Sequence, residues 1–151
     1  MARSHIIIDY ARRREFVPFH DRAARFACIV THRRAGKTVA CIQDLQRGAL
    51  DCPLVRPRFA YLAPFLKQSK AVAWDYLRAA MAPLRVHGAS AHESELRVDY
   101  ANGGQVRLYG ADNPDAIRGI YLDGIVLDEY ADMDPRVWSE IIRPALADRR
   151  A

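Results

Sequence analysis

The segment Thr31-His-Arg-Arg-Ala-Gly-Lys-Thr38 decides the fold class, because an apolar run precedes it and a helix-forming segment follows it. The run Phe26-Ala-Cys-Ile-Val30 predicts a short buried strand, and residues 37–49 carry apolar side chains at helical spacing. A strand, a loop that ends in Gly-Lys-Thr and a helix form the layout of a phosphate-binding P-loop. One position departs from the full pattern, which has glycine where this chain has Thr31.

The residue types of this phosphate loop (residues 31–38) fit the binding of a nucleoside triphosphate. Gly36 lacks a Cβ, so the backbone can curve closely around a phosphate, and the N–H groups at the start of the helix point at the anion. Lys37 can reach the β- and γ-phosphates, and the Thr38 hydroxyl can ligate Mg²⁺. We therefore expect the nucleotide to contact the whole loop: Thr31, His32, Arg33, Arg34, Ala35, Gly36, Lys37 and Thr38.

A second motif lies at residues 122–130, Leu-Asp-Gly-Ile-Val-Leu-Asp-Glu-Tyr. It predicts a buried strand over residues 124–127 that delivers Asp128 and Glu129 at its carboxyl end, where parallel α/β sheets bind their ligands. We expect Asp128 to hold Mg²⁺ and Glu129 to orient or deprotonate the water that attacks the γ-phosphate. The alternative is that the two acids only stabilise a helix N-terminus. The two motifs in this order predict an ATPase that uses ATP and Mg²⁺.

Length and composition indicate one domain that is not embedded in a membrane. The chain has 151 residues, half of them hydrophobic, and a net charge of +5. No run approaches the ~18 apolar residues of a membrane span. Lysine occurs only at positions 37, 67 and 70, so nearly all basic residues are arginine. Arginine is the better phosphate ligand and a basic surface suits nucleic acid, although an arginine bias also follows from genomic base composition.

The order of expected elements favours a three-layer α/β fold. Strands are expected at residues 26–30, 59–63, 95–100, 106–109 and 124–127, and helices at 37–49, 66–81 and from 134 onward. The central sheet should be largely parallel, with an antiparallel hairpin that turns at Asn102-Gly-Gly104. Residues 1–25 are expected to be a lead-in, and residues 26–151 to form the P-loop ATPase domain.

Aromatic residues gather just before the first expected strand, at Phe16, Phe19 and His20. In an ATPase this is a place where adenine is stacked and hydrogen-bonded, so His20 is a candidate for nucleotide binding. The alternative is a loop whose aromatic side chains cover the edge of the sheet.

Further stretches match, in order, a known family: Tyr61-Leu-Ala-Pro64 with Gln68 and Trp74, Leu108-Tyr-Gly-Ala111, Ile117-Arg-Gly119, Val126-Leu-Asp-Glu-Tyr-Ala131 and Arg143-Pro-Ala-Leu146. Together with the paired arginines of the phosphate loop, the chain resembles the ATPase domain of bacteriophage and prophage large terminase subunits. These proteins are the motors that pump DNA into procapsids. The resemblance covers most of residues 16–148.

The resemblance implies a RecA-like (ASCE) P-loop fold in which ATP hydrolysis powers the packaging of double-stranded DNA. It makes Lys37 and Thr38 the Walker A pair and Asp128 and Glu129 the Walker B pair. An arginine of the terminase P-loop acts in cis on the γ-phosphate, and Arg33 fits that position best, with Arg34 beside it. Arg118 looks like the arginine that some terminases offer across a ring interface; its alternative role is a structural salt bridge.

The family also implies partners and a location. They are double-stranded DNA, the terminase small subunit, the portal, further copies of the chain in a ring, and the cytoplasm of a bacterial host. Two departures matter: the family usually has Gln where this chain has His20, and the chain stops at Ala151. We therefore expect a truncated ATPase domain without the coupling segment and without the nuclease domain.

Two other functions remain open from the sequence. Residues 128–132, Asp-Glu-Tyr-Ala-Asp, resemble the acidic box of helicase-type DNA translocases. Alternatively, the chain is a truncated, non-catalytic module for nucleotide binding or assembly, because an incomplete sheet would expose a strand edge that invites association.

Overall fold

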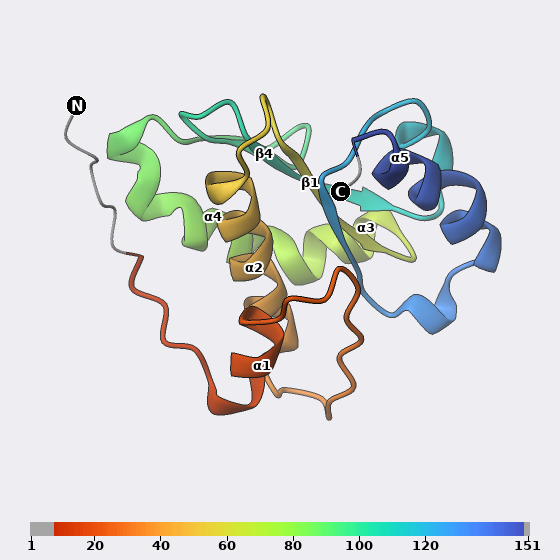
Figure 1. Cartoon of the computed structure of the whole chain (residues 1–151), viewed down its shortest axis with the longest axis horizontal. Coiled ribbons are helices and arrows are strands. Elements are labelled where there is room, and N and C mark those ends of the chain that lie inside the picture. The colour runs from red at the N-terminus through yellow and green to blue at the C-terminus, as the bar shows by residue number, and fades with distance from the viewer. Residues whose placement is uncertain (1–7, 150–151) are drawn as a thin grey trace.

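The computed structural model describes residues 8–149, which form a five-stranded sheet covered by helices on both faces (Figure 1). The strands lie in the order β2-β3-β4-β1-β5. Their bounds are β1 Arg58–Ala63, β2 Ser90–His92, β3 Arg97–Asp99, β4 Gln105–Gly110 and β5 Gly124–Leu127. Residues 1–7 of the predicted lead-in and 150–151 of the predicted ATPase domain lie outside the described part.

The α-helices are α1 Val17–His20, α2 Lys37–Asp51, α3 Leu66–Ser69, α4 Asp75–Met81 and α5 Arg143–Ala147. Shorter 3-10 and π turns lie between them: η1 Arg14–Phe16, η2 Lys70–Trp74, η3 Ala82–His87, η4 Pro114–Ala116, η5 Tyr130–Asp132 and η6 Val137–Ile142. Since α3, η2 and α4 run on without a break, the helix predicted over 66–81 is confirmed. Within residues 8–149, none of the helices combines the length and the apolar composition that a bilayer crossing requires.

The sheet combines parallel and antiparallel pairing. Strand β1 pairs in parallel with β4 and with β5. Strands β2, β3 and β4 pair antiparallel, and the predicted hairpin turns where the Tyr100 N–H donates to the Gly104 carbonyl. The α/β class and the hairpin are therefore confirmed, whereas the short edge strand β2 was not expected from the sequence.

Alternate residues of β1 point to two separate cores. Tyr61 and Ala63 pack against α2, α4 and η3, whereas Ala60 and Leu62 pack against the segment from Met133 to Leu146. Helices α2 and α5 accordingly lie on opposite sides of β1 (Figure 1). This arrangement gives the three layers that the element order predicts.

One aromatic ring spaces α2 from β5. A Cβ added at Gly48 of α2, or at Gly124 of β5, would lie 2.5 Å from the Phe59 ring. Real Cβ atoms do not approach other atoms so closely, so both backbones rest directly on this ring.

The strand predicted over residues 26–30 is wrong. These residues have no regular structure, and the side chains of Phe26 and Val30 are 60% and 89% exposed. Phe26 instead contacts Trp138 of η6, with the ring centroids 5.9 Å apart. A strand needs a hydrogen-bonded neighbour as well as apolar, β-branched side chains, and β5 is the last strand of the described sheet on this side. The phosphate loop is therefore entered from an irregular segment.

Candidate nucleotide-binding site

The two sequence motifs meet in space at the carboxyl end of β5. Helix α2 begins at Lys37, and its Nζ lies 3.1 Å from Asp128 Oδ1 and 3.6 Å from Glu129 Oε1. The three residues come from segments about ninety positions apart in the chain, so this contact depends on the fold. It brings together the lysine and the two acids that the sequence predicts to act on one nucleotide.

Asp128 and Glu129 lie in different environments. The Asp128 N–H donates to the Leu62 carbonyl at 2.8 Å, which extends the β1–β5 ladder by one residue, and its side chain is 11% exposed. Glu129 leaves the strand with φ of +50°, and its side chain is 52% exposed. Its side chain makes no capping hydrogen bond to the following turn η5. This geometry gives no support to the alternative of a simple helix cap.

Lys37 is held in its charged form by the acid pair. Burial by itself would lower the pKa of Lys37, but hydrogen bonding and attraction from Asp128, with a further contribution from Glu129, raise it. The lysine therefore stays a cation at neutral pH.

Tyr61 also contacts Asp128, and the sequence interpretation missed it. Its buried hydroxyl donates to Asp128 Oδ2 at 2.5 Å. Burial, followed by the Asp128 carboxylate, raises the pKa of Tyr61, while a hydrogen bond with the Thr38 hydroxyl opposes the rise. The phenol is thus neutral, and the predicted metal ligands Thr38 and Asp128 lie beside the same hydroxyl. A hydroxyl and a carboxylate are oxygen ligands of the kind that Mg²⁺ prefers, so the residues fit this ion.

The loop before α2 has the backbone of a tight turn. Arg34 and Gly36 adopt φ of +64° and +95°, and the His32 ring donates to the Arg33 carbonyl at 2.7 Å. Residues 31–34 are exposed, and Ala35 is half-buried. All eight predicted contact residues thus form one surface loop that leads into α2.

Arg13 lies against this loop, which the sequence interpretation also missed. Its guanidinium donates to the Ala35 carbonyl at 2.6 Å and lies 3.1 Å from where a Cβ of Gly36 would be. Gly36 therefore serves twice, because it permits the positive φ and leaves space for the guanidinium. The sequence showed Arg13 only as part of a basic cluster.

The predicted catalytic arginines differ in their surroundings. The side chains of Arg33 and Arg34 are exposed and make no ion pair with any residue in 8–149. Arg118 is 63% exposed and pairs with Asp115 at 3.2 Å. Among the described residues, no hydrogen bond or ion pair joins Arg118 to the phosphate loop or to the acid pair. The local ion pair matches the structural alternative, and a role across a ring interface stays a prediction.

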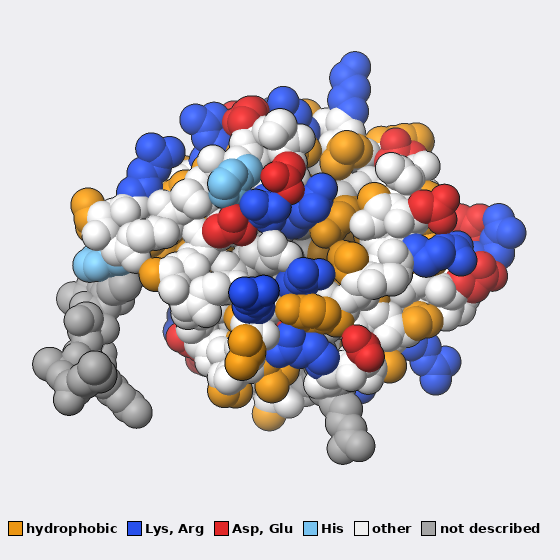
Figure 2. Space-filling view, turned by 90° about the horizontal axis from the view of Figure 1, so that it is seen from above, with side chains coloured by type: hydrophobic (Ala, Val, Ile, Leu, Met, Phe, Trp, Pro, Cys, Tyr) orange, Lys and Arg blue, Asp and Glu red, His pale blue; other side chains and the backbone are white. Residues whose placement is uncertain are grey.

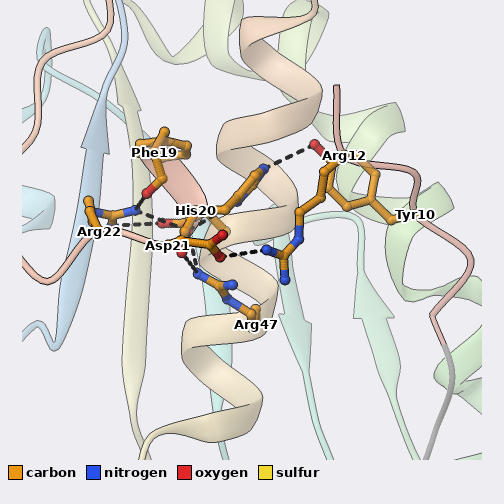
Figure 3. A network of polar contacts seen from close by, with 8 residues as sticks. Tyr10, Arg12, Phe19, His20, Asp21, Arg22 and Arg47 are labelled. Atoms are coloured by element: carbon orange, nitrogen blue, oxygen red, sulfur yellow. Dashed lines mark hydrogen bonds and ion pairs between the residues drawn. The ribbon is translucent and has the colours of Figure 1, made fainter. Parts of the chain in front are cut away.

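His20 lies in a polar network between the lead-in and α2 (Figure 3). Its ring is buried, with Nε2 3.1 Å from the Tyr10 hydroxyl and Nδ1 3.4 Å from Asp44 Oδ1. Arg22 and Arg47 also pair with Asp44, and Arg47 donates to the His20 carbonyl at 2.6 Å. Both ring nitrogens have partners within the protein, so a role of His20 toward adenine stays a prediction that this geometry does not support.

The buried ring predicts acid sensitivity. Burial lowers the pKa of His20, although Asp44 opposes the shift while Arg47 and Arg12 reinforce it. Below about pH 6.5, the ordinary histidine pKa, the unfolded chain binds a proton that the folded chain resists. Stability must therefore fall as the pH falls through this range.

We expect the free energy of unfolding in urea to decrease less between pH 7.5 and 5.5 in His20→Gln than in the wild type. The control is His87→Gln, at an exposed position in η3. Equal pH dependence of the wild type and His20→Gln would contradict the assignment.

Comparison with solved structures relates this fold to known proteins. The large terminase ATPase domain of Thermus phage P74-26 superposes with a TM-score of 0.66 and 24% identity, over 79% of this chain and 53% of that one. The large terminase of another thermophilic bacteriophage matches in its complex with ATP-gamma-S (TM-score 0.58, 20% identity, 78% of this chain and 28% of that one). Its ADP complex matches similarly (TM-score 0.57, 21% identity, 79% and 29%).

These matches confirm the predicted fold and the structural resemblance to phage large terminase ATPase domains. The chain spans about half the length of the P74-26 ATPase domain. Neither protein-family models nor curated proteins match the sequence.

Proposed function

We propose that the chain is an ATPase module of a phage large terminase, which binds ATP with Mg²⁺ and hydrolyses it. The observation that carries the proposal is the contact of Lys37 with Asp128 and Glu129 at 3.1 and 3.6 Å, at the carboxyl end of β5. The fold similarity supports it, as do the complexes of a similar terminase with ATP-gamma-S and ADP.

The residues divide the work by position and charge. The phosphate loop, residues 31–38, receives the phosphates, and Lys37 exchanges its acid partners for phosphate oxygens. Thr38 and Asp128 hold Mg²⁺, which when bound neutralises phosphate charge. The exposed Glu129 orients the attacking water and accepts its proton. Arg33 stabilises the charge that develops on the γ-phosphate.

We propose that hydrolysis serves the packaging of double-stranded DNA in the cytoplasm of a bacterial host. The net charge of +5 supports a nucleic-acid partner. Figure 2 shows Lys and Arg side chains spread over the viewed face with Asp and Glu between them, so the positive charge is distributed there and not gathered in one stripe. Assembly with the small subunit, the portal and further copies in a ring, with Arg118 at the interface, belongs to the same proposal.

The test of nucleotide binding is Lys37→Ala. Loss of one charge-assisted phosphate contact costs about 1.5–3 kcal/mol, so affinity for ATP with Mg²⁺ should fall at least about tenfold in titration calorimetry. Lys67→Ala, at an exposed position of α3, removes the same charge and should bind like the wild type. Equal affinity of Lys37→Ala and the wild type would remove the site.

One observation favours a second candidate, a non-catalytic nucleotide-binding or assembly module. In the described part of the chain, β5 pairs only with β1, and the apolar residues 26–30 beside the phosphate loop are exposed. Such an open edge favours association. ATP binding without turnover, together with oligomers in sedimentation, would select this candidate. No described feature favours the helicase-type alternative.

A further inference from the structure

We propose that Tyr61 is a positioning residue that orients Asp128 toward Mg²⁺ and so sets how strongly nucleotide binding depends on the metal. This inference rests on the proposed function and adds a residue to it. It concerns the hydroxyl of Tyr61 and not its ring, which belongs to the core.

The sheet register places Tyr61 beside the acid. Tyr61 pairs with Val126 across the parallel β1–β5 ladder, and the ladder continues with the hydrogen bond from Asp128 to Leu62. Side chains alternate along a strand, so Tyr61 and Asp128 share the sheet face that α2 covers. This is also the face on which Lys37 and Thr38 enter at the start of the helix.

The two oxygens of Asp128 have different partners. Oδ2 accepts from the Tyr61 hydroxyl at 2.5 Å, and Oδ1 lies 3.1 Å from Lys37 Nζ. The tyrosine partner is fixed, since its residue is 1% exposed, whereas the lysine side chain is 31% exposed. Oδ2 is therefore held by a rigid part of the core, and Oδ1 is the oxygen whose partner can change.

A carboxylate held in this way is oriented before its ligand arrives. A hydrogen bond to an ionised acceptor is stronger than one between neutral groups, so it fixes the rotation of the carboxylate with Oδ1 turned toward the phosphate loop. Groups that orient metal ligands typically change metal affinity or activity by about 10–100-fold when they are removed. Tyr61 occupies that position with respect to Asp128.

The test is Tyr61→Phe, which keeps the ring and removes the hydroxyl. ATP binding is followed by a fluorescent nucleotide analogue while Mg²⁺ is titrated. We expect the Mg²⁺ concentration for half-maximal binding to rise about tenfold or more, with unchanged binding in EDTA. Unchanged Mg²⁺ dependence of a folded Tyr61→Phe would overturn the proposal.

Tyr100→Phe is the matched control. Tyr100 is also buried, belongs to the same core cluster, and donates its hydroxyl to Gln46 Oε1 at 3.1 Å, with no contact to the acid pair. We expect both variants to lower the melting temperature by a similar amount and only Tyr61→Phe to shift the Mg²⁺ titration. An equal shift in Tyr100→Phe would trace the effect to a loosened core and overturn the proposal.

A measurement that keeps every hydroxyl covers the case in which Tyr61→Phe does not fold. In protein labelled with 3-fluorotyrosine, Mn²⁺ with ATP should broaden one fluorine resonance more than all others. That resonance should persist in Tyr100→Phe and in Tyr109→Phe, the other buried tyrosines. Its disappearance in either variant would overturn the proposal. Absence of ATP binding in the wild type, or full binding by Lys37→Ala, would instead show that the proposed function fails.

Discussion

Arg33→Ala is expected to slow ATP hydrolysis by about 10³–10⁵-fold, the range known for arginines that reach a transferring γ-phosphoryl group. Arg33 is exposed in the phosphate loop, and its side chain pairs with no acid in the described part of the chain. Its guanidinium is therefore available to a nucleotide bound in its own subunit. Single-turnover hydrolysis of radiolabelled ATP measures the effect.

Two further alanine variants sharpen this test. Arg14→Ala removes an exposed arginine of η1 and should leave the rate unchanged. Arg34→Ala addresses the neighbouring arginine, and a large loss there with none in Arg33→Ala would move the cis role to Arg34. If neither variant slows hydrolysis, the loop arginines have no catalytic role.

Mixed assemblies separate Arg33 from Arg118. Where the chain forms rings, mixing Arg118→Ala with Glu129→Gln subunits should restore some activity, because each subunit supplies what the other lacks. Mixing Arg33→Ala with Glu129→Gln should restore none, because the arginine and the acid must act in one subunit. Rescue of the Arg33 mixture would contradict the cis role. Failure of the Arg118 mixture in proven mixed rings would leave Arg118 with its Asp115 ion pair.

Glu129→Gln is expected to keep ATP and Mg²⁺ bound while hydrolysis falls about 10²–10⁴-fold, the usual contribution of a general base. The amide cannot accept the proton of the attacking water. The side chain is 52% exposed and caps no helix, so its loss should leave the fold intact. Binding by calorimetry and single-turnover rates measure the two effects separately.

Glu140→Gln, at an exposed position of η6, is the matched control and should hydrolyse ATP like the wild type. Turnover of Glu129→Gln at the wild-type rate would reduce the acid to a surface charge. Loss of binding together with hydrolysis would assign Glu129 to the metal site in place of the water.

Local patterns predicted the parts of the site that are continuous in the chain. The helix that begins at Lys37, the strand that ends before Asp128 and the hairpin around Asn102 were all expected, because periodicity and turn residues encode them directly. The meeting of Lys37 with the acids also followed, because parallel strands deliver their carboxyl ends to one edge. These features depend on one segment at a time or on a general rule of topology.

Features that depend on a particular neighbour were missed. The apolar residues 26–30 have the composition of a strand, but pairing requires an adjacent strand that composition does not specify. Tyr61 was assigned to a strand, whereas its contact with Asp128 depends on the register between β1 and β5. Alternation could have placed it on the α2 face, but not beside that carboxylate. The contact of Arg13 with Gly36 depends on the path of an irregular segment, for which no pattern exists.

The Phe59 ring between Gly48 and Gly124 acts as a hinge pin for the site. Helix α2 carries Lys37 at its first residue and rests on this ring eleven residues later, roughly 16 Å along its axis. Strand β5 rests on the same ring just before it delivers Asp128. A methyl group at either glycine would tilt the helix against the strand, and the helix would act as a lever that enlarges the tilt at Lys37. The spacing between the lysine and its acids is therefore set in part at the far end of the helix, where no nucleotide-binding residue is expected.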